Sequence, residues 1–151
     1  MDKWLVLCLV LACVLLLFFA TAFAGKDVLT FIENKPSPSD WVHDNQIQVT
    51  NNKIIINIPN AKLVSYSNTK SMDPTIDQGA NGIEIQPSST EQIHVGDIVA
   101  FKQGNEIISH RVVEIGNDEY GWFCKVKGDN SPLTDKIRFQ DIVGIVVAII
   151  Y

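Results

Sequence analysis

The sequence predicts a mainly β domain with a barrel-like sheet, preceded by one N-terminal transmembrane helix. Three observations carry this prediction: residues 4–24 form an almost unbroken apolar run without a charge, residues 35–41 contain two helix-breaking prolines, and short apolar runs separated by Gly and Asn turns follow residue 46. Short strands with such turn residues between them are typical of all-β barrels and sandwiches. The expected parts are an anchor at 1–25, a linker at 26–45 and a β-rich domain at 46–151.

The apolar run is long enough to cross a membrane, because about 20 helical residues span a hydrocarbon core of ~30 Å. A cleavable signal peptide is the alternative, since Ala22-Phe23-Ala24 resembles a cleavage site. The apolar cores of signal peptides usually hold about 7 to 15 residues, so the length favours a retained, single-pass anchor in the cell membrane. By the positive-inside rule, Lys3 favours a cytoplasmic N-terminus and a domain on the extracytoplasmic side.

The strand-like segments begin with a hairpin, in which 46–49 and 53–58 flank the turn residues Asn51-Asn52. Segments 79–85 and 93–96 then flank a Pro-Ser-Ser-Thr loop. The other expected strands are 61–67, 97–103, 107–115, 122–126 and 137–150.

Composition excludes some classes of protein. The chain has 151 residues and a formal net charge of -5, whereas a nucleic-acid surface needs a clustered basic patch. Of the three cysteines, Cys8 and Cys13 lie in the apolar run and Cys124 lies in the domain. This distribution cannot build a disulfide framework within the domain, and no Cys/His spacing matches a zinc site. Cys124 is expected to be a small buried side chain.

Four short blocks carry the candidate chemistry: SMDPT at 71–75, GDIV at 96–99, SHRVV at 109–113 and KGDNSPLTD at 127–135. Together they supply a serine, a histidine and aspartates, each beside a strand-like run. A serine hydroxyl is a poor nucleophile at neutral pH and needs a base within hydrogen-bond reach, which is in turn oriented by a third group. The blocks therefore favour nucleophilic catalysis.

These blocks, in this order, resemble the type I signal peptidases of the archaeal and endoplasmic-reticulum branch, in which histidine replaces the bacterial lysine base. The resemblance covers roughly residues 64–150. It implies that Ser71 is the nucleophile, that His110 is the general base, and that Asp129 and Asp135 are the acidic residues. Many members carry serine where this chain has Thr69.

The resemblance also implies an activity. The protein would be a membrane-anchored serine endopeptidase that removes signal peptides from exported preproteins through an acyl-enzyme, cutting after small residues. Its partners would be these preproteins and membrane lipid, without a metal or an organic cofactor. Whether partner subunits are needed stays open.

His110 is the best candidate for the base. Alternation along the predicted strand 107–115 puts His110 on one face with Ile108, Val112 and Glu114. Burial on this mostly apolar face would lower the histidine pKa and keep the base neutral. The alternative is a core histidine that is hydrogen-bonded to backbone. The sequence leaves open which aspartate orients the ring, although Asp135 is preferred.

Other residues near the serine have assignable roles. The backbone N–H of Ser71 and the Thr69 hydroxyl are the candidate oxyanion donors. Met72 either lines the specificity pocket or belongs to the core. Arg111 is expected to be an ion-pair partner of an aspartate, and Asp97 is expected to have a structural role in its turn.

Three alternatives accompany this interpretation. A lysine base would also activate serine, but Lys70 is adjacent to Ser71, and neighbouring side chains in an extended segment point apart. A related self-cleaving serine peptidase of the repressor type would need a DNA-binding segment where the apolar run stands. A non-catalytic anchored β module that binds an envelope partner would keep the fold and tolerate Ser71→Ala.

Overall fold

The computed structural model describes residues 3–4 and 34–151. The chain divides into two units, 1–34 and 35–151, and the β domain is the second. Most of the predicted anchor falls on residues 5–24, which lie outside the described residues. In the part of the chain that the structure does describe, no helix is both long and apolar enough to span a membrane.

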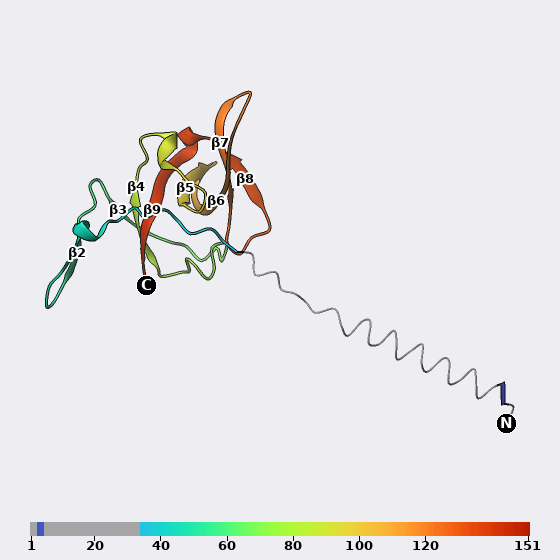
Figure 1. The fold of residues 1–151 in the computed structure, drawn as a ribbon, viewed down its shortest axis with the longest axis horizontal. Coiled ribbons are helices and arrows are strands. Elements are labelled where there is room, and N and C mark those ends of the chain that lie inside the picture. The colour runs from blue at the N-terminus through green and yellow to red at the C-terminus, as the bar shows by residue number, and fades with distance from the viewer. Residues whose placement is uncertain (1–2, 5–33) are drawn as a thin grey trace. The chain divides into compact units, whose positions relative to one another are not determined.

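The domain is mainly β, as the sequence predicts (Figure 1). In chain order the elements are η1 (Asp44–Gln46), β1 (Ile47–Val49), β2 (Ile54–Ile56), β3 (Lys62–Ser65), β4 (Asn81–Ile85), η2 (Thr90–Gln92), β5 (Ile98–Gln103), β6 (Glu106–Asp118), β7 (Gly121–Lys127), β8 (Thr134–Ile137), η3 (Phe139–Asp141) and β9 (Ile142–Ile150).

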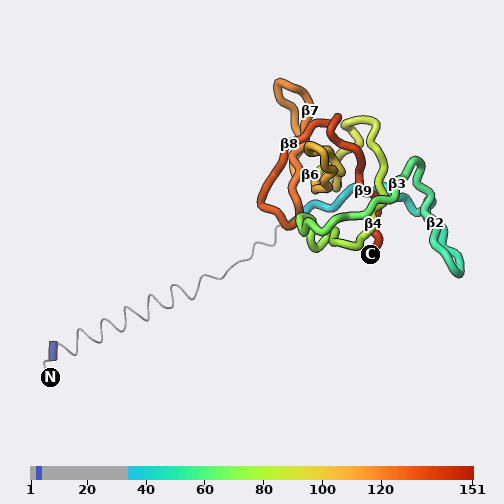
Figure 2. The backbone as a smooth tube through the Cα atoms, turned by 180° about the vertical axis from the view of Figure 1, so that it is seen from behind, coloured from blue at the N-terminus to red at the C-terminus, as the bar shows by residue number. Residues whose placement is uncertain are grey.

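Seven strands form one antiparallel sheet in the order β3-β4-β9-β5-β6-β7-β8. The sheet curls round on itself (Figures 1 and 2). Its two edge strands, β3 and β8, do not pair with each other in the described chain, so the sheet is not a closed barrel. Closure is the part of the predicted architecture that the structure does not show.

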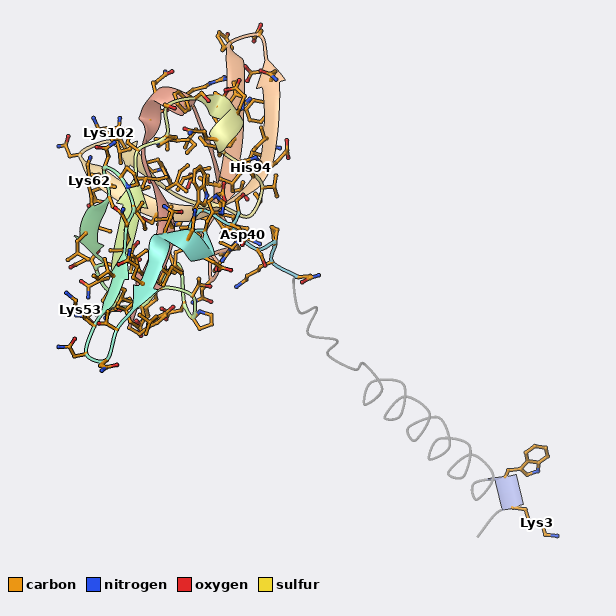
Figure 3. All side chains as sticks on the ribbon, turned by 60° about the vertical axis from the view of Figure 1, so that its left-hand side comes forward. Lys3, Asp40, Lys53, Lys62, His94 and Lys102 are labelled. Carbon is orange, nitrogen blue, oxygen red and sulfur yellow. The ribbon has the colours of Figure 1, made fainter. Side chains whose placement is uncertain are left out.

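The predicted N-terminal hairpin is confirmed, because β1 and β2 pair antiparallel with Ile47 opposite Ile56 and Val49 opposite Ile54. This hairpin forms a separate two-stranded sheet that extends away from the larger one (Figures 1 and 2). Figure 3 shows the side chains of the domain, with Lys53 of the β1–β2 hairpin labelled.

Two predicted strands differ from the structure. The segment 93–96 is a turn, in which Gly96 has a φ of 104° that disfavours other residues. The segment 137–150 divides into the end of β8, the turn η3 and the strand β9. Asp141 causes the division, since its carboxylate accepts a hydrogen bond from the backbone N–H of Arg138 at 3.1 Å and closes a turn.

The main core lies between the central strands and contains Ile93, Val99, Phe101, Val112, Cys124, Val126, Ile137, Ile142 and Ile145. Cys124 is fully buried, as expected, and burial raises the pKa of its thiol to about 12. A second cluster lies under the 71–80 segment and contains Met72, Ile76, Ala80, Ile98 and Val146. This second cluster supports the turn that carries Ser71.

Part of the predicted linker belongs to the domain. The buried Asp97 carboxylate accepts hydrogen bonds from the Ser39 backbone N–H at 2.8 Å and from Trp41 Nε1 at 3.3 Å. Arg111 donates to the carbonyl of Pro36 at 3.1 Å. A Cβ on Gly96 would lie 2.0 Å from the Ser37 carbonyl oxygen, so a glycine is needed at the point where the linker residues pass over this turn. Asp97 therefore has the structural role that the sequence suggests.

Candidate active site

The turn that carries Ser71 follows β3 and is hydrogen-bonded to the loop between β7 and β8. The Ser71 carbonyl accepts from the Asn130 backbone N–H at 2.8 Å, and Asn130 Nδ2 donates to the Lys70 carbonyl at 3.1 Å. The Asp129 backbone N–H donates to Met72 Sδ at 3.4 Å. These contacts bring two of the four sequence blocks, 71–75 and 127–135, to one place.

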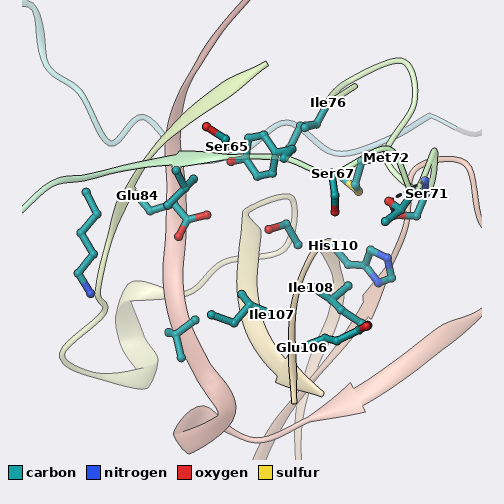
Figure 4. A pocket seen from close by; sticks show the side chains of 16 residues that line it. Ser65, Ser67, Ser71, Met72, Ile76, Glu84, Glu106, Ile107, Ile108 and His110 are labelled. Atoms are coloured by element: carbon teal, nitrogen blue, oxygen red, sulfur yellow. Dashed lines mark hydrogen bonds between the residues drawn. The ribbon is translucent and has the colours of Figure 1, made fainter. Parts of the chain in front are cut away.

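Gly128 lies at the point where the serine and the histidine meet. A Cβ on this buried glycine would lie 2.6 Å from the Ser71 carbonyl oxygen and 3.1 Å from His110 Nε2. Ser71 and His110 therefore converge on one small volume, with the Nε2 side of the imidazole facing it. Figure 4 shows the two side chains next to each other at one end of a pocket.

The Ser71 hydroxyl contacts Thr69. Their two oxygens, Ser71 Oγ and Thr69 Oγ1, lie 3.1 Å apart, and the Ser71 backbone N–H donates to Thr69 Oγ1 at 3.4 Å. The Thr69 hydroxyl thus lies directly beside that of Ser71. In the described structure Ser71 makes no side-chain hydrogen bond with His110, and such bonds often form only in the substrate complex.

His110 lies on β6 opposite Val99 of β5, and its side chain is 10% exposed. Its ring packs against Phe101 with 5.9 Å between ring centroids. Burial lowers the pKa of His110, while the charges of Asp135 and Asp129 oppose this shift. The imidazole therefore favours the neutral form that a base requires, as its predicted apolar face indicates.

The predicted alternation along β6 is wrong beyond Val112. The pairing register with β7 shifts between Val112 and Glu114, so Val113 is an extra residue in this strand. Glu114 is exposed and forms an ion pair with Lys125 at 2.7 Å instead of sharing the inner face of His110.

Asp135 is the carboxylate nearest the other ring nitrogen of His110. Asp135 Oδ2 lies 3.8 Å from His110 Nδ1, which is longer than a hydrogen bond. Nδ1 is buried and has no hydrogen-bond partner among the described residues. A small side-chain movement of Asp135, which lies on β8 and is partly exposed, would give this nitrogen an acceptor.

Asp129 is held by Arg111 in a bidentate ion pair, with Nε to Oδ1 at 2.8 Å and NH2 to Oδ2 at 2.7 Å. The Thr75 hydroxyl also donates to this carboxylate. Burial acts to raise the pKa of Asp129, but the hydrogen bonds from Arg111 and Thr75 outweigh it and lower that pKa. Arg111 is the ion-pair partner that the sequence suggests, and Asp129 shapes the loop more directly than it contacts His110.

The pocket beside Ser71 and His110 has a volume of about 830 Å³ (Figure 4). It is lined by Lys62, Val64, Ser65, Tyr66, Ser67, Thr69, Ser71, Met72, Ile76, Glu84, Glu106, Ile107, Ile108, Ser109, His110 and Val143. Met72 both lines the pocket and packs in the second core cluster. Among the described lining residues the only lysine is Lys62, on β3, so the pocket places neither Lys70 nor Lys127 as a base.

Sequence reasoning missed three residues that shape the site. Gly128 belongs to the block 127–135 but has no reactive group, and its close contacts depend on segments that are distant in sequence. Glu84 and Tyr66 also line the pocket. The one available signal for Glu84 is a carboxyl group between Ile83 and Ile85 in an otherwise apolar strand.

Among the described residues, no group of three or more His, Cys, Asp or Glu side chains is arranged to hold a metal ion. Comparison of the chain with models of protein families, with curated proteins and with solved structures gave no match. The site therefore has to be interpreted from its own chemistry: a serine and a neutral histidine that meet in a pocket, with a carboxylate near the second ring nitrogen.

Proposed function

We propose that this protein is a serine endopeptidase that removes signal peptides from exported preproteins, anchored in the cell membrane by residues 4–24 with its domain on the extracytoplasmic side. The observation that carries the proposal is the convergence of Ser71 and His110 on Gly128 at one end of a pocket. The resemblance of the four sequence blocks to the type I signal peptidases supports the substrate class. Tethering of enzyme and preprotein to one membrane would raise their effective concentration.

In the proposed reaction, Ser71 Oγ attacks the scissile carbonyl carbon while His110 Nε2 takes the hydroxyl proton. The imidazolium then gives this proton to the leaving amine, which breaks the peptide bond and leaves an acyl-enzyme. Water attacks the ester carbonyl, with His110 again as base, and Ser71 is regenerated. Asp135 would accept a hydrogen bond from Nδ1 and stabilise the charged ring during both steps.

Cleavage of a preprotein by the full-length protein in detergent or lipid tests this proposal. The preprotein carries small residues before the cleavage site, and we compare the wild type with Ser71→Ala and His110→Ala. Matched controls are Ser88→Ala, which removes an exposed serine outside the pocket lining, and His94→Ala, which removes an exposed histidine. We expect the first two variants to lose about 10³-fold or more in kcat/KM and both controls to keep activity.

The results have separate meanings. If Ser71→Ala is inactive but His110→Ala retains activity, the base is another group. If the wild type does not cut and a serine-directed acylating probe does not label Ser71, the peptidase proposal is wrong.

A second candidate function is a binding module, and the β1–β2 hairpin favours it. This hairpin exposes apolar side chains to solvent, with Val49 73% and Ile54 67% exposed. An exposed apolar surface of this kind is typical of interaction sites. A binding module would retain partner binding after Ser71→Ala, whereas it would lose binding when Val49 and Ile54 are both replaced by serine.

A further inference from the structure

The far end of the pocket holds polar side chains that the proposed reaction does not use. Glu84 lies away from Ser71 and His110 in Figure 4, and Tyr66 lines the same pocket. We propose that Glu84 and Tyr66 form a subsite for a basic side chain of the bound polypeptide, at a position removed from the scissile bond. This inference rests on the proposed function, since it concerns the substrate of the same site.

Glu84 lacks a partner. Its side chain belongs to β4, is only 7% exposed, and makes no hydrogen bond or ion pair with any described residue. Burial raises the pKa of this carboxyl group, and the positive charge of Lys62 opposes the shift. Because Glu84 is largely buried, a ligand that donates hydrogen bonds to its carboxyl group would offset part of the cost of removing that group from water.

Tyr66 has the same property. Its hydroxyl is buried without a hydrogen-bond partner among the described residues. The Tyr66 hydroxyl oxygen lies over Gly82, since a Cβ there would be 2.0 Å from it, and Gly82 and Glu84 are the two buried residues on the same face of β4. The hydroxyl and the carboxyl group therefore belong to one face of this strand, in the same pocket.

Two glycines make room for these groups. A Cβ on Gly144 would lie 2.6 Å from Glu84 Oε2, and a Cβ on Gly82 would lie 2.0 Å from the Tyr66 hydroxyl oxygen. Any other residue at either position would force these side chains to move. The backbone of β4 and β9 thus allows the carboxyl and the hydroxyl to sit close to the sheet, inside the pocket.

A basic side chain fits this chemistry. A lysine ammonium has three donors and an arginine guanidinium has five, enough to satisfy a carboxylate and a hydroxyl together. The apolar lining residues Val64, Ile107 and Val143 would contact the aliphatic stem of such a side chain. Lys62 lies opposite Glu84 in the β3–β4 register and its charge acts to lower the pKa of Glu84, but Lys62 is exposed and no ion pair within 4.0 Å joins the two side chains among the described residues.

The test measures binding, so it does not depend on cleavage. Fluorescent peptides with an Ala-x-Ala cleavage site are titrated against the full-length Ser71→Ala protein in detergent. One lysine is moved along the peptide, one position at a time, and each peptide is compared with its glutamine counterpart. At one position we expect lysine to tighten Kd by about 10-fold or more, as hydrogen bonds between charged groups contribute.

Further substitutions in the Ser71→Ala background assign the effect. Glu84→Gln should abolish the preference for lysine over glutamine, and Tyr66→Phe should reduce the preference. Glu91→Gln, a change of an exposed glutamate outside the pocket, is the matched control and should keep it. Lys62→Gln asks whether the chain's own lysine competes for Glu84.

Three outcomes overturn the inference: no position shows a preference for lysine, the preference survives Glu84→Gln, or it appears only after Lys62→Gln. The last outcome would mean that Lys62 itself fills the subsite. Cleavage of the glutamine peptide by the wild type reports separately on the peptidase. Cleavage without a preference for lysine would defeat the subsite alone, whereas a Glu84-dependent preference without cleavage would defeat the peptidase alone.

Discussion

Replacement of Gly128 by alanine tests the convergence of Ser71 and His110 directly. The backbone of Gly128 is outside the left-handed region, so alanine meets no conformational penalty there. Its Cβ would lie 2.6 Å from the Ser71 carbonyl oxygen, about 0.8 Å closer than the 3.4 Å at which ordinary contacts begin. It would also lie 3.1 Å from His110 Nε2. The Ser71 carbonyl and the His110 ring must therefore both move away from residue 128.

The expected size of the effect follows from this overlap. Displacement of a reacting group by about 1 Å costs on the order of 10²-fold in rate, and overpacking costs about 1–3 kcal/mol of stability. We therefore expect Gly128→Ala to fold, to lose about 2 kcal/mol in urea unfolding, and to lose about 10²-fold in kcat/KM on a fluorogenic signal peptide. Loss of stability alone would not explain so large a loss of rate.

Gly104→Ala is the matched control. Gly104 lies in the β5–β6 turn with a φ of 62°, and a Cβ there would have nothing within 4 Å. Alanine in this conformation costs about 1–2 kcal/mol through backbone strain, so it should destabilise the domain by a similar amount without loss of activity. If Gly128→Ala keeps the wild-type kcat/KM, the two groups that meet at Gly128 are not the reacting pair.

Two further predictions concern the charged groups. Activity should fall as pH decreases through the lowered pKa of His110, below about 6.5. Asp135→Asn should move this fall to lower pH, because it removes a negative charge that raises the pKa of His110. A pH profile of kcat/KM that moves to higher pH in this variant would contradict the reasoning. Arg111→Met should cost about 3–5 kcal/mol in urea unfolding, since it leaves the buried Asp129 charge unpaired, whereas Arg138→Met, which removes a more exposed ion pair with Asp118, should destabilise the domain much less. The pKa of Asp129 is lowered in the folded protein, so the stability that its pairing contributes to the wild type should be present above the unfolded pKa of about 4 and should be lost as pH falls through that lowered pKa. Equal stabilities of Arg111→Met and wild type at neutral pH would contradict the pairing.

The local parts of the fold are predictable from the sequence. The pairing of β5 with β6 follows from strand-like runs on both sides of Gly104-Asn105, and the hairpin of β1 and β2 follows from Asn51-Asn52 in the same way. The position of β9 between β4 and β5 is not predictable from such patterns, because it depends on contacts between segments far apart in the chain. The extra residue Val113 in β6 is likewise set by the pairing partner β7.

The candidate site shows the same division. The sequence blocks identify Ser71, His110, Asp129 and Asp135 as candidates, and the structure places the first two together. Motifs cannot show that Asp129 forms an ion pair with Arg111 while Asp135 lies near Nδ1 of His110. Spacing along a chain does not determine distance across a sheet. Glu84 belongs to no block, and its burial depends on the missing side chain of Gly144 on a different strand.

Arg111 explains why adjacent residues on β6 can both be buried. His110 and Arg111 point to opposite faces of the strand, and each face is covered: the histidine by the pocket and Phe101, the arginine by Asp129 and the carbonyls of Pro36 and Gly96. The guanidinium therefore joins the first segment of the domain to the loop that carries Gly128. Since this loop is hydrogen-bonded to the Ser71 carbonyl through Asn130, loss of Arg111 should displace the serine as well as weaken the fold.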